Sequence, residues 1–343
     1  MLIEDLRILK KCLNEDGCDN MISVAMATYN SERYIIQQLD SIVNQTQKVD
    51  EVIIQDDCSQ DETVDIIKQY IKDKNLKNWK VERNEHNMGY VLTFKNAIQR
   101  CNGEIIILCD HDDVWMKNKV ELISKTFAEN LNILVLATSF TEIDDEGKDI
   151  YIKKRRGSSN NNLIRRKINY GKLNHMFFKD VAIYNISPGC TCAFKKEIKK
   201  ELLKKNYDIP HDWQIELIGV LRNGLYYLDV VTTKYRIHSK NTIGLGHQTE
   251  YDKRLKLCIN GLKEKEEIKS LINTNKYVKS DYIKYINKVI KVFKLRVKLM
   301  QTKNIIKYGT KALVYSIGMG RLYESVGIDI ISIIKDNKRG KNK

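Results

Sequence analysis

The feature that most limits how this chain can fold is an alternation of short apolar runs with helical patterns between residues 22 and 140. Such alternation favours parallel strands, because each intervening helix returns the chain to the same edge of the sheet. It predicts an α/β domain whose mostly parallel central sheet is covered by helices on both faces. The expected strands are 22–26, 51–54, 104–109 and 133–137, and the expected helices are 34–43, 63–70, 91–98 and 117–127.

Charge is distributed unevenly along the 343 residues. Residues 1–150 carry 17 Lys and Arg against 28 Asp and Glu, whereas residues 151–343 carry 42 against 16. The hydrophobic content of 42% is sufficient for a globular core. An acidic half joined to a strongly basic half indicates that the two halves meet different partners.

Eight cysteines are scattered without a CxxC pair, and we expect them to be reduced thiols in a cytosolic protein. The first residues lack the basic and apolar regions of a signal peptide, and no window approaches about 18 consecutive apolar residues. We therefore expect a chain that is neither exported nor membrane-spanning.

Three regions are expected along the chain: an N-terminal extension over 1–20, a domain over 21–250 and a basic helical C-terminal module over 251–343. The last region carries 23 Lys and Arg against 8 Asp and Glu. Its pattern is helical up to the apolar run 328–334, which has the composition of a strand.

The second half of the expected domain begins with a basic, polar segment over 153–167, which is typical of a mobile loop over a functional site. The elements expected after it are an apolar run at 181–186, a turn at Pro188-Gly189, helices near 195–204 and 213–221, and a strand at 225–230.

Three carboxylates follow the apolar run 105–109 within four residues, in the sequence Asp110-His111-Asp112-Asp113-Val114-Trp115. Alternate carboxylates of such a DxD pattern share a face on an extended segment, so they can contact a ribose and a metal ion at once. Clustered acids at the carboxyl end of a strand are typical of a hard-cation site in an open α/β sheet. The alternative is that Asp112 or Asp113 only caps the helix that begins near Lys117.

Two earlier strand ends carry polar motifs as well. Thr28-Tyr29-Asn30 closes the first expected strand, where Asn favours a tight turn and an aromatic ring can lie against a nucleobase. Asp56-Asp57 closes the second, and a carboxylate there can accept a hydrogen bond from a base N–H. A purely structural turn explains the first motif equally well, and Ser59 or Asp61 has the position of a helix cap.

In order and spacing, seven motifs resemble those of family 2 glycosyltransferases of the GT-A fold, and most closely those of the rhamnosyltransferase-like branch. The resemblance covers roughly residues 21–247. The motifs are Ala27-Thr28-Tyr29-Asn30, Asp56-Asp57-Cys58-Ser59-Gln60-Asp61, Asn87-Met88-Gly89, Asp110 to Trp115, Pro188-Gly189-Cys190-Thr191-Cys192, His211-Asp212-Trp213 and Tyr235 to Gly244. Two positions depart from the branch: His111 stands where Gln is usual, which leaves the DxD carboxylates unchanged, and Pro188 stands where Thr or Ser is more frequent, which bears on the acceptor side.

The resemblance implies a Rossmann-like GT-A domain that moves a sugar, with inversion, from a UDP- or dTDP-linked donor to a glycan or lipid-linked acceptor in cell-surface polysaccharide biosynthesis. It also implies dependence on Mn²⁺ or Mg²⁺. Asp57 would hold the base, Asp110 the ribose and Asp112 the cation. The further expected contacts are Thr28, Tyr29, Asn30 and Gly89 for the donor, His238 for the metal, and Gly189, Cys190, His211 and Trp213 on the acceptor side.

Asp212 is implied as the base that takes the proton from the acceptor hydroxyl. Its context agrees, because Ile209-Pro210-His211-Asp212-Trp213 places a carboxylate at the start of a helix beside an aromatic ring. The alternative is a helix-capping Asp beside a core Trp. For His238, the alternative to contact with the cation or the diphosphate is a hydrogen-bonded structural role.

The C-terminal module contains an amphipathic pattern over 282–300. A basic amphipathic helix suits an anionic membrane surface, which predicts a cytoplasmic protein that lies on the inner face of the membrane. The alternative is a helix packed on the catalytic domain with a solvated lysine face. The apolar face comprises Ile283, Ile286, Ile290, Phe293, Val297 and Met300, and the basic face Lys284, Lys288, Lys291, Lys294 and Lys298.

Two other classes of function compete with an enzyme. Charge alone favours a nucleic-acid-binding protein, although no interleaved aromatic stripe accompanies the lysines. A nucleotide-binding domain without catalysis is the second alternative. The presence of all four acids, Asp57, Asp110, Asp112 and Asp212, favours the enzyme, and no nucleic acid partner is expected.

Overall fold

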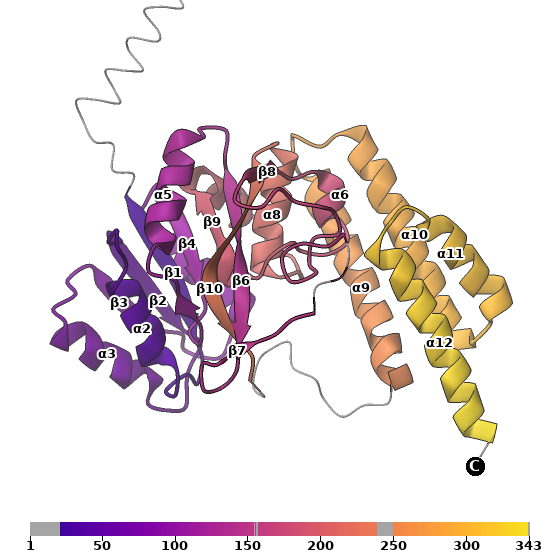
Figure 1. Ribbon diagram of the computed structural model, residues 1–343, viewed down its shortest axis with the longest axis horizontal. Coiled ribbons are helices and arrows are strands. Elements are labelled where there is room, and N and C mark those ends of the chain that lie inside the picture. The colour runs from indigo at the N-terminus through magenta and orange to yellow at the C-terminus, as the bar shows by residue number, and fades with distance from the viewer. Residues whose placement is uncertain (1–20, 154, 156, 239–249, 342–343) are drawn as a thin grey trace, which may run out of the picture.

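The computed structural model describes residues 21–153, 155, 157–238 and 250–341. Its centre is one mixed sheet with the strand order β3-β2-β1-β4-β9-β6-β10-β5, to which β7 and β8 add short edge pairings (Figure 1). The strands are β1 (Ile22–Thr28), β2 (Glu51–Asp56), β3 (Trp79–Arg83), β4 (Ile105–Cys109), β5 (Val114–Trp115), β6 (Val135–Ile143), β7 (Asp149–Ile150), β8 (Leu173–His175), β9 (Cys192–Lys195) and β10 (Leu225–Arg236).

The N-terminal half of the sheet is the predicted parallel unit. Strands β3, β2, β1 and β4 are neighbours and run parallel. The α-helices that connect and cover them are α2 (Ile35–Val43), α3 (Thr63–Asp73), α4 (Tyr90–Arg100) and α5 (Lys119–Glu129). The predicted α/β fold class is confirmed, and all four strands expected between residues 22 and 140 are present, with β3 and β5 as additions.

Strand β9 was not expected, and it is inserted between β4 and β6 antiparallel to both. Its residues were assigned in part to a helix near 195–204, which is reduced to a 3₁₀ turn over Lys196–Ile198 and the short helix α7 (Lys199–Leu202). The four residues of β9 form too short a run to identify a strand from the sequence. Pairing with two partner strands decides their conformation.

The side chains of the central strands alternate between two hydrophobic clusters. Val24 and Met26 of β1 face the cluster that contains α2, α3 and α5, whereas Ala25 and Ala27 face the cluster that contains α4. Because both faces are covered, β1 is buried along its whole length. The second cluster also contains α6 (Phe178–Val181) and α8 (His211–Leu221).

The C-terminal helices pack on this second cluster. They are α9 (Glu250–Asn273), α10 (Ser280–Thr302), the π-helical turn η3 (Ile305–Gly309), α11 (Thr310–Ser316) and α12 (Arg321–Lys341). Ile268 of α9 and Ile286 of α10 belong to the same hydrophobic cluster as Trp213 of α8. The basic module therefore shares a core with the domain that it follows, while the predicted boundary near residue 250 stays a prediction.

One expectation about local structure is wrong. The run 328–334 is part of helix α12, because Val326, Ile330 and Ile333 are spaced to bury one helical face.

The described part of the segment 153–167 is a loop, as expected, with contacts to the domain. Asn160 Nδ2 donates to the Ile186 carbonyl at 2.6 Å, and Ile164 is buried. The mobility expected of this loop stays a prediction.

None of the described helices is both long and apolar enough to cross a bilayer. The six cysteines of the described part are unpaired thiols, and five of them are buried. The predicted N-terminal extension, residues 1–20, and the end of the seventh motif, within 239–249, lie outside the described residues.

Candidate active site

Three of the predicted motifs meet because their strands are adjacent and parallel. Strand β1 lies between β2 and β4, so the residues that follow the three strands share one edge of the sheet. The backbone N–H of Asp57 donates to the Thr28 carbonyl at 2.8 Å, and His111 Nδ1 lies 3.2 Å from the carbonyl of Ala27. This edge is where open α/β sheets bind their ligands.

The turn after β1 is fixed by side chains of the turn after β2. Asn30 adopts a left-handed conformation with φ of 47°. Its Oδ1 accepts from the Gln60 N–H at 2.8 Å, and its own N–H donates to Ser59 Oγ at 2.9 Å. Tyr29 is 42% exposed, whereas Thr28 is buried and donates to Asp56 Oδ1. The tyrosine ring is therefore the available one of the three predicted donor contacts.

Asp57 holds the loop that precedes α4. Its carboxylate accepts from Asn84 Nδ2 at 3.0 Å, from the Met88 N–H at 2.7 Å and from the Gly89 N–H at 2.9 Å. A carboxylate offers about four acceptor positions, so these donors leave one of them open. Gly89 has φ of +79°, a conformation that a side chain would strain. The structure thus brings together Asp57 and Gly89, two of the predicted donor-binding residues.

The DxD segment follows β4 and lies against the end of β10. His238 Nε2 lies 2.8 Å from Asp112 Oδ2, which joins the two residues predicted to hold the cation. Arg236 is buried and donates through Nε to the Asp112 carbonyl at 2.7 Å. Its backbone N–H donates to Asp113 Oδ1 at 2.9 Å. The pairing of β5 with β10 carries His238 to this position.

A second group of possible metal ligands lies in the same cluster. Oxygens of Asp110 and Asp113 and the sulfur of Cys190 lie within 4.8 Å of one another. Asp113 is fully buried, and its Oδ2 has no hydrogen-bond partner among the described residues. A buried carboxylate oxygen without a donor is costly, and a bound cation would satisfy it. The two carboxylates therefore fit a divalent cation, whereas burial raises the pKa of the Cys190 thiol, which Mg²⁺ and Mn²⁺ do not prefer as a ligand.

The pKa values of these acids reflect crowding. Burial, followed by the charges of Asp113 and Asp112, raises the pKa of Asp110 well above its usual range. Burial and the charge of Asp112 raise the pKa of Asp113 to about 7. Burial opposes ionisation of Asp112 too, but nearby His111 and the hydrogen bond from His238 lower its pKa. The cluster is thus short of positive charge.

Lys119 supplies a buried cation beside this cluster, and it was missed. Its Nζ donates to the Cys190 carbonyl at 2.5 Å and to Thr233 Oγ1 at 3.0 Å, and it lies 4.0 Å from the centre of the Trp115 ring. Burial lowers the pKa of this amine. Lys119 and Arg236 carry no local sequence signal that separates them from other basic residues, although Arg236 lies within a motif that was recognised.

Asp212 lies in the first turn of α8 and is close enough to Asp110 to raise the pKa of that carboxyl. Burial raises the pKa of Asp212 itself to about 6, although hydrogen bonds from the Trp213 N–H and Asn185 Nδ2 act in the opposite direction. A carboxylate with such a pKa is matched to take a proton near neutral pH.

Gly189 and Glu216 position the segment that faces Asp212. A side chain at Gly189 would come within 3.3 Å of His211 Nε2 and 3.5 Å of Asp212 Cβ. Glu216, which was not predicted, is buried and accepts from the Ile186 N–H at 3.0 Å and from Ser187 Oγ at 2.9 Å. The two contacts fix the backbone that carries Gly189.

The rings of His211 and Trp213 lie on opposite sides of Asp212 in the sequence and are both buried. His211 stacks on Phe94 with ring centres 3.9 Å apart, and both of its ring nitrogens lack a partner among the described residues. Burial lowers the pKa of His211 to about 3. Trp213 donates to the Val181 carbonyl at 2.7 Å and packs under Lys265 Nζ at 4.1 Å. These are the contacts of a core tryptophan. Cys190, which was also expected on the acceptor side, is fully buried as well.

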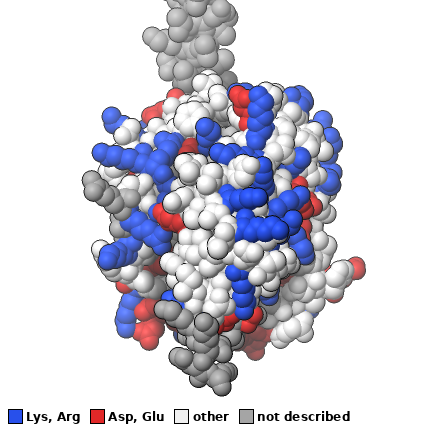
Figure 2. Space-filling view, turned by 90° about the vertical axis from the view of Figure 1, so that its right-hand side faces the viewer, with Lys and Arg blue, Asp and Glu red and all other residues white. Residues whose placement is uncertain are grey.

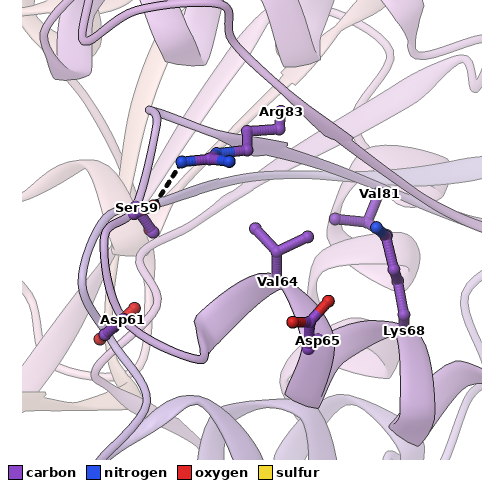
Figure 3. A pocket seen from close by; sticks show the side chains of 7 residues that line it. All are labelled: Ser59, Asp61, Val64, Asp65, Lys68, Val81 and Arg83. Atoms are coloured by element: carbon purple, nitrogen blue, oxygen red, sulfur yellow. Dashed lines mark hydrogen bonds between the residues drawn. The ribbon is translucent and has the colours of Figure 1, made fainter.

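A surface hollow of ≈ 230 Å³ lies beside the Asp57 turn, between that turn, α3 and β3 (Figure 3). Arg83 reaches over it and donates to the Ser59 carbonyl at 2.7 Å. Its lining includes none of the predicted site residues. We therefore assign it no part in the site at the carboxyl edge.

The parallel sheet and its acid-rich carboxyl edge define a Rossmann-like protein of the class that binds nucleotides at the ends of its strands. The chain belongs to glycosyl transferase family 2, whose family model matches residues 23–202. It is therefore a glycosyltransferase, which confirms the predicted enzyme class.

Curated relatives match part of the chain. A putative teichuronic acid biosynthesis glycosyltransferase, TuaG of Bacillus subtilis, is 36% identical over 102 residues, which are 29% of this chain and 39% of the relative. The poly(ribitol-phosphate) beta-N-acetylglucosaminyltransferase TarS of Staphylococcus aureus is 37% identical over 102 residues, 29% of this chain and 17% of the relative. An uncharacterized glycosyltransferase of Rickettsia bellii, 34% identical over 130 residues, is covered over 18% of its length and 38% of this chain. The matches thus span less than half of these relatives.

Solved structures share the fold. Residues 1–349 of S. aureus TarS in complex with UDP-GlcNAc superpose with a TM-score of 0.61 and 17% identity, over 93% of this chain and 92% of that one. The mannosyltransferase PcManGT of Pyrobaculum calidifontis, in complex with GDP-Man and Mn²⁺, gives a TM-score of 0.54 and 14% identity over 98% and 94%. At these identities the likeness is one of fold.

Proposed function

We propose that this chain is a metal-dependent, inverting glycosyltransferase of the rhamnosyltransferase-like branch, which moves a sugar from a UDP- or dTDP-linked donor to a glycan or lipid-linked acceptor. The single observation that carries the proposal is the proximity of Asp212, a buried carboxylate with a pKa of about 6, to the strand-end acid Asp110. Gly189 lies against Asp212, and the next residue, Cys190, lies beside Asp110 and Asp113. A base and a cation site at one edge are what inverting transfer requires.

The donor half of the proposal uses the turns after β1 and β2. Tyr29 is the exposed ring that would stack on the base, and the remaining acceptor position of Asp57 would receive a base N–H. Asp110 would accept hydrogen bonds from the ribose. The UDP-GlcNAc complex of the structurally similar TarS supports a uridine donor, whereas the motif Asp110 to Trp115 supports the dTDP-linked donors implied by the rhamnosyltransferase-like branch.

The fit of a divalent cation rests on Asp112 with His238 and on the unsatisfied oxygen of Asp113. These residues would hold Mn²⁺ or Mg²⁺, and the bound ion would neutralise the charge of the leaving diphosphate. The Mn²⁺ complex of the Pyrobaculum neighbour supports the same class of ion.

The transfer step uses Asp212 as the base. The carboxylate takes the proton from the acceptor hydroxyl, and the hydroxyl oxygen forms a bond to the anomeric carbon from the face opposite the diphosphate. The bond from that carbon to the diphosphate oxygen breaks, and its electron pair leaves with the diphosphate. The product therefore has the opposite anomeric configuration, and the proton is retained on Asp212 until it exchanges with solvent.

The setting proposed for the reaction is polysaccharide assembly at the cytoplasmic face of a membrane. The names of TuaG and TarS refer to teichuronic acid and poly(ribitol-phosphate), which supports a polymer of the cell surface as the product. A lipid-linked acceptor would also account for the basic second half of the chain.

The test combines donor binding with turnover. Thermal unfolding of the protein would be measured with UDP-, dTDP- and GDP-sugars, with and without Mn²⁺, because a ligand of the native state raises its stability. With the stabilising donor, Asp212→Asn should lower transfer by about 10²- to 10⁴-fold without loss of donor binding. Asp73→Asn, the same change at an exposed carboxylate of α3, should retain wild-type transfer. Near-normal transfer by Asp212→Asn would refute the base assignment.

A further inference from the structure

The helix expected to meet a membrane has no free apolar face. Ile286, Ile290 and Phe293 of α10 are buried within the hydrophobic cluster that joins the C-terminal helices to the catalytic domain. Its five predicted lysines remain exposed. The amphipathic pattern over 282–300 is thus explained by packing. Helix α10 could contact a bilayer through its lysines, but its apolar side chains are not available for insertion.

Exposed apolar side chains gather instead on the last helices. Ile306 of η3 is 85% exposed, and Val314 and Ile317, at the end of α11, are 65% and 64% exposed. Along α12, Ile328, Ile331 and Ile334 recur at intervals of three and are each at least 43% exposed. Gly309, the last residue of η3, lies against Ile330 of α12, and α11 also contacts α12, so the three elements are neighbours. We call these six residues the apolar face.

The charges around the apolar face are strongly biased. The acids of this region are already paired: Glu324 with Arg165 at 2.6 Å, Asp336 with Lys303 at 2.8 Å, and buried Asp329 with Arg296 at 2.7 Å. Lys307, Lys311 and Lys335 are exposed and make no ion pair with the described residues. Figure 2 shows the result from this side of the molecule, where uncharged surface is flanked by Lys and Arg with few Asp or Glu.

We propose that the apolar face and its lysines form a docking surface for an anionic lipid bilayer. Branched aliphatic side chains insert among acyl chains, and lysines beside them contact the phosphates of anionic headgroups. The six residues are isoleucine and valine, and Tyr323 is the single exposed aromatic ring among the described residues of α12, which favours lipid over the stacked bases of a nucleic acid. The aliphatic side chains therefore favour a lipid bilayer as the partner of this surface, and the lysines favour anionic over zwitterionic lipid.

The docking surface is rigidly coupled to the catalytic domain. Glu324 at the start of α12 pairs with Arg165 and Arg155, which precede α6, and Tyr184 lies within hydrogen-bonding distance of Ser325. The helices α9 to α12 also share a hydrophobic cluster with α8, which carries Asp212. Docking would consequently fix the direction in which the carboxyl edge of the sheet faces the membrane.

The experiment is cosedimentation of the full chain with vesicles, without any donor sugar. Wild-type protein should bind phosphatidylglycerol-containing vesicles at least tenfold more tightly than pure phosphatidylcholine, and 0.5 M NaCl should weaken this binding. Val314→Ser with Ile317→Ser, and separately Lys307→Glu with Lys311→Glu, should each weaken binding at least tenfold. Lys284→Glu with Lys288→Glu on α10 makes the same charge change outside the docking surface and should alter binding less than twofold.

The outcomes separate this inference from the proposed function. Donor-induced thermal stabilisation of each variant serves as a test of folding and of the catalytic site, and it should equal that of the wild type. If the α10 variant lost vesicle binding as strongly as the Lys307 and Lys311 variant, the loss would be explained by net charge alone. That result would overturn the assignment of the docking surface. Retained binding in the Val314 and Ile317 variant would do so too. A wild-type dimer that becomes monomeric in that variant, without vesicle binding, would identify a second copy of the chain as the occupant.

Discussion

The acids at the end of β2 and the acids at the end of β4 have similar sequences but opposite environments. Asp56 accepts hydrogen bonds from Thr28 and Ser59, and Asp57 accepts from Asn84 and from two backbone N–H groups. At the end of β4, the buried Asp113 Oδ2 has no donor among the described residues. The difference teaches that the first pair mainly shapes the backbone, whereas the second cluster keeps a buried acceptor that the proposed cation would satisfy.

The largest effect is expected at the second cluster. Asp112→Ala should lower transfer by at least about 100-fold and abolish the Mn²⁺ dependence of donor binding, because the carboxylate is proposed to hold the cation. The free energy of unfolding without metal should change by less than about 1 kcal/mol, since the lost contact with His238 is offset by weaker repulsion among the acids. Donor titrations with and without Mn²⁺ check this. A normal response to the metal would remove Asp112 from the cation site.

At Asp56 and Asp57, a substitution should change the stability of the protein more than its activity. Asp56→Ala leaves the Thr28 and Ser59 donors without their acceptor and should lower the free energy of unfolding by about 3 kcal/mol, as measured by urea denaturation. Asp65→Ala, on the exposed side of α3, is the matched control and should be nearly neutral. If both variants had the same free energy of unfolding, Asp56 would not stabilise the backbone at the end of β2, and the proposed difference between the two strand ends would be refuted.

The pH dependence of transfer extends the comparison to Asp212. Its raised pKa of about 6 means that the carboxylate is protonated, and unable to act as a base, as the pH falls below 6. The value of kcat/KM, which reports ionisation of the free enzyme, should therefore decrease roughly tenfold per pH unit below 6 and level off above about 7. Rates at limiting acceptor concentration between pH 4.5 and 8 test this. A flat profile across pH 5 to 7 would exclude Asp212 as the titrating base.

The smallest effect should be a gain. Asp113→Asn keeps an oxygen for the Arg236 N–H and removes one charge from the crowded cluster, so the free energy of unfolding in chelator should rise by about 1 kcal/mol. Chemical denaturation at pH 7.5 measures it. If Asp113→Asn lowered the stability as much as Asp56→Ala, both acid groups would stabilise the fold, and the difference drawn between them would be wrong.

The sequence predicted those parts of the site that depend on strand direction. Continuous apolar runs identified β1, β2 and β4, and parallel order alone then brought their terminal motifs to one edge. Contacts between residues distant in the chain could not be read in the same way. His238 meets Asp112 only because β5 pairs with β10, and the Trp213 ring is covered by Lys265 from a later helix.

The sequence did not predict strand β9 for a related reason, since its conformation depends on pairing with strands distant in the chain. Its position bears on how the chain folds. It supplies the second neighbour of β4, the strand that carries the acid cluster, yet it is synthesised much later. Until residue 195 has emerged and docked, β4 presents a row of unpaired backbone groups, as any edge strand does. Completion of the sheet is thus a late, long-range event that slows folding, and a nascent chain halted before β9 is exposed to aggregation through β4, the strand that precedes the acid cluster.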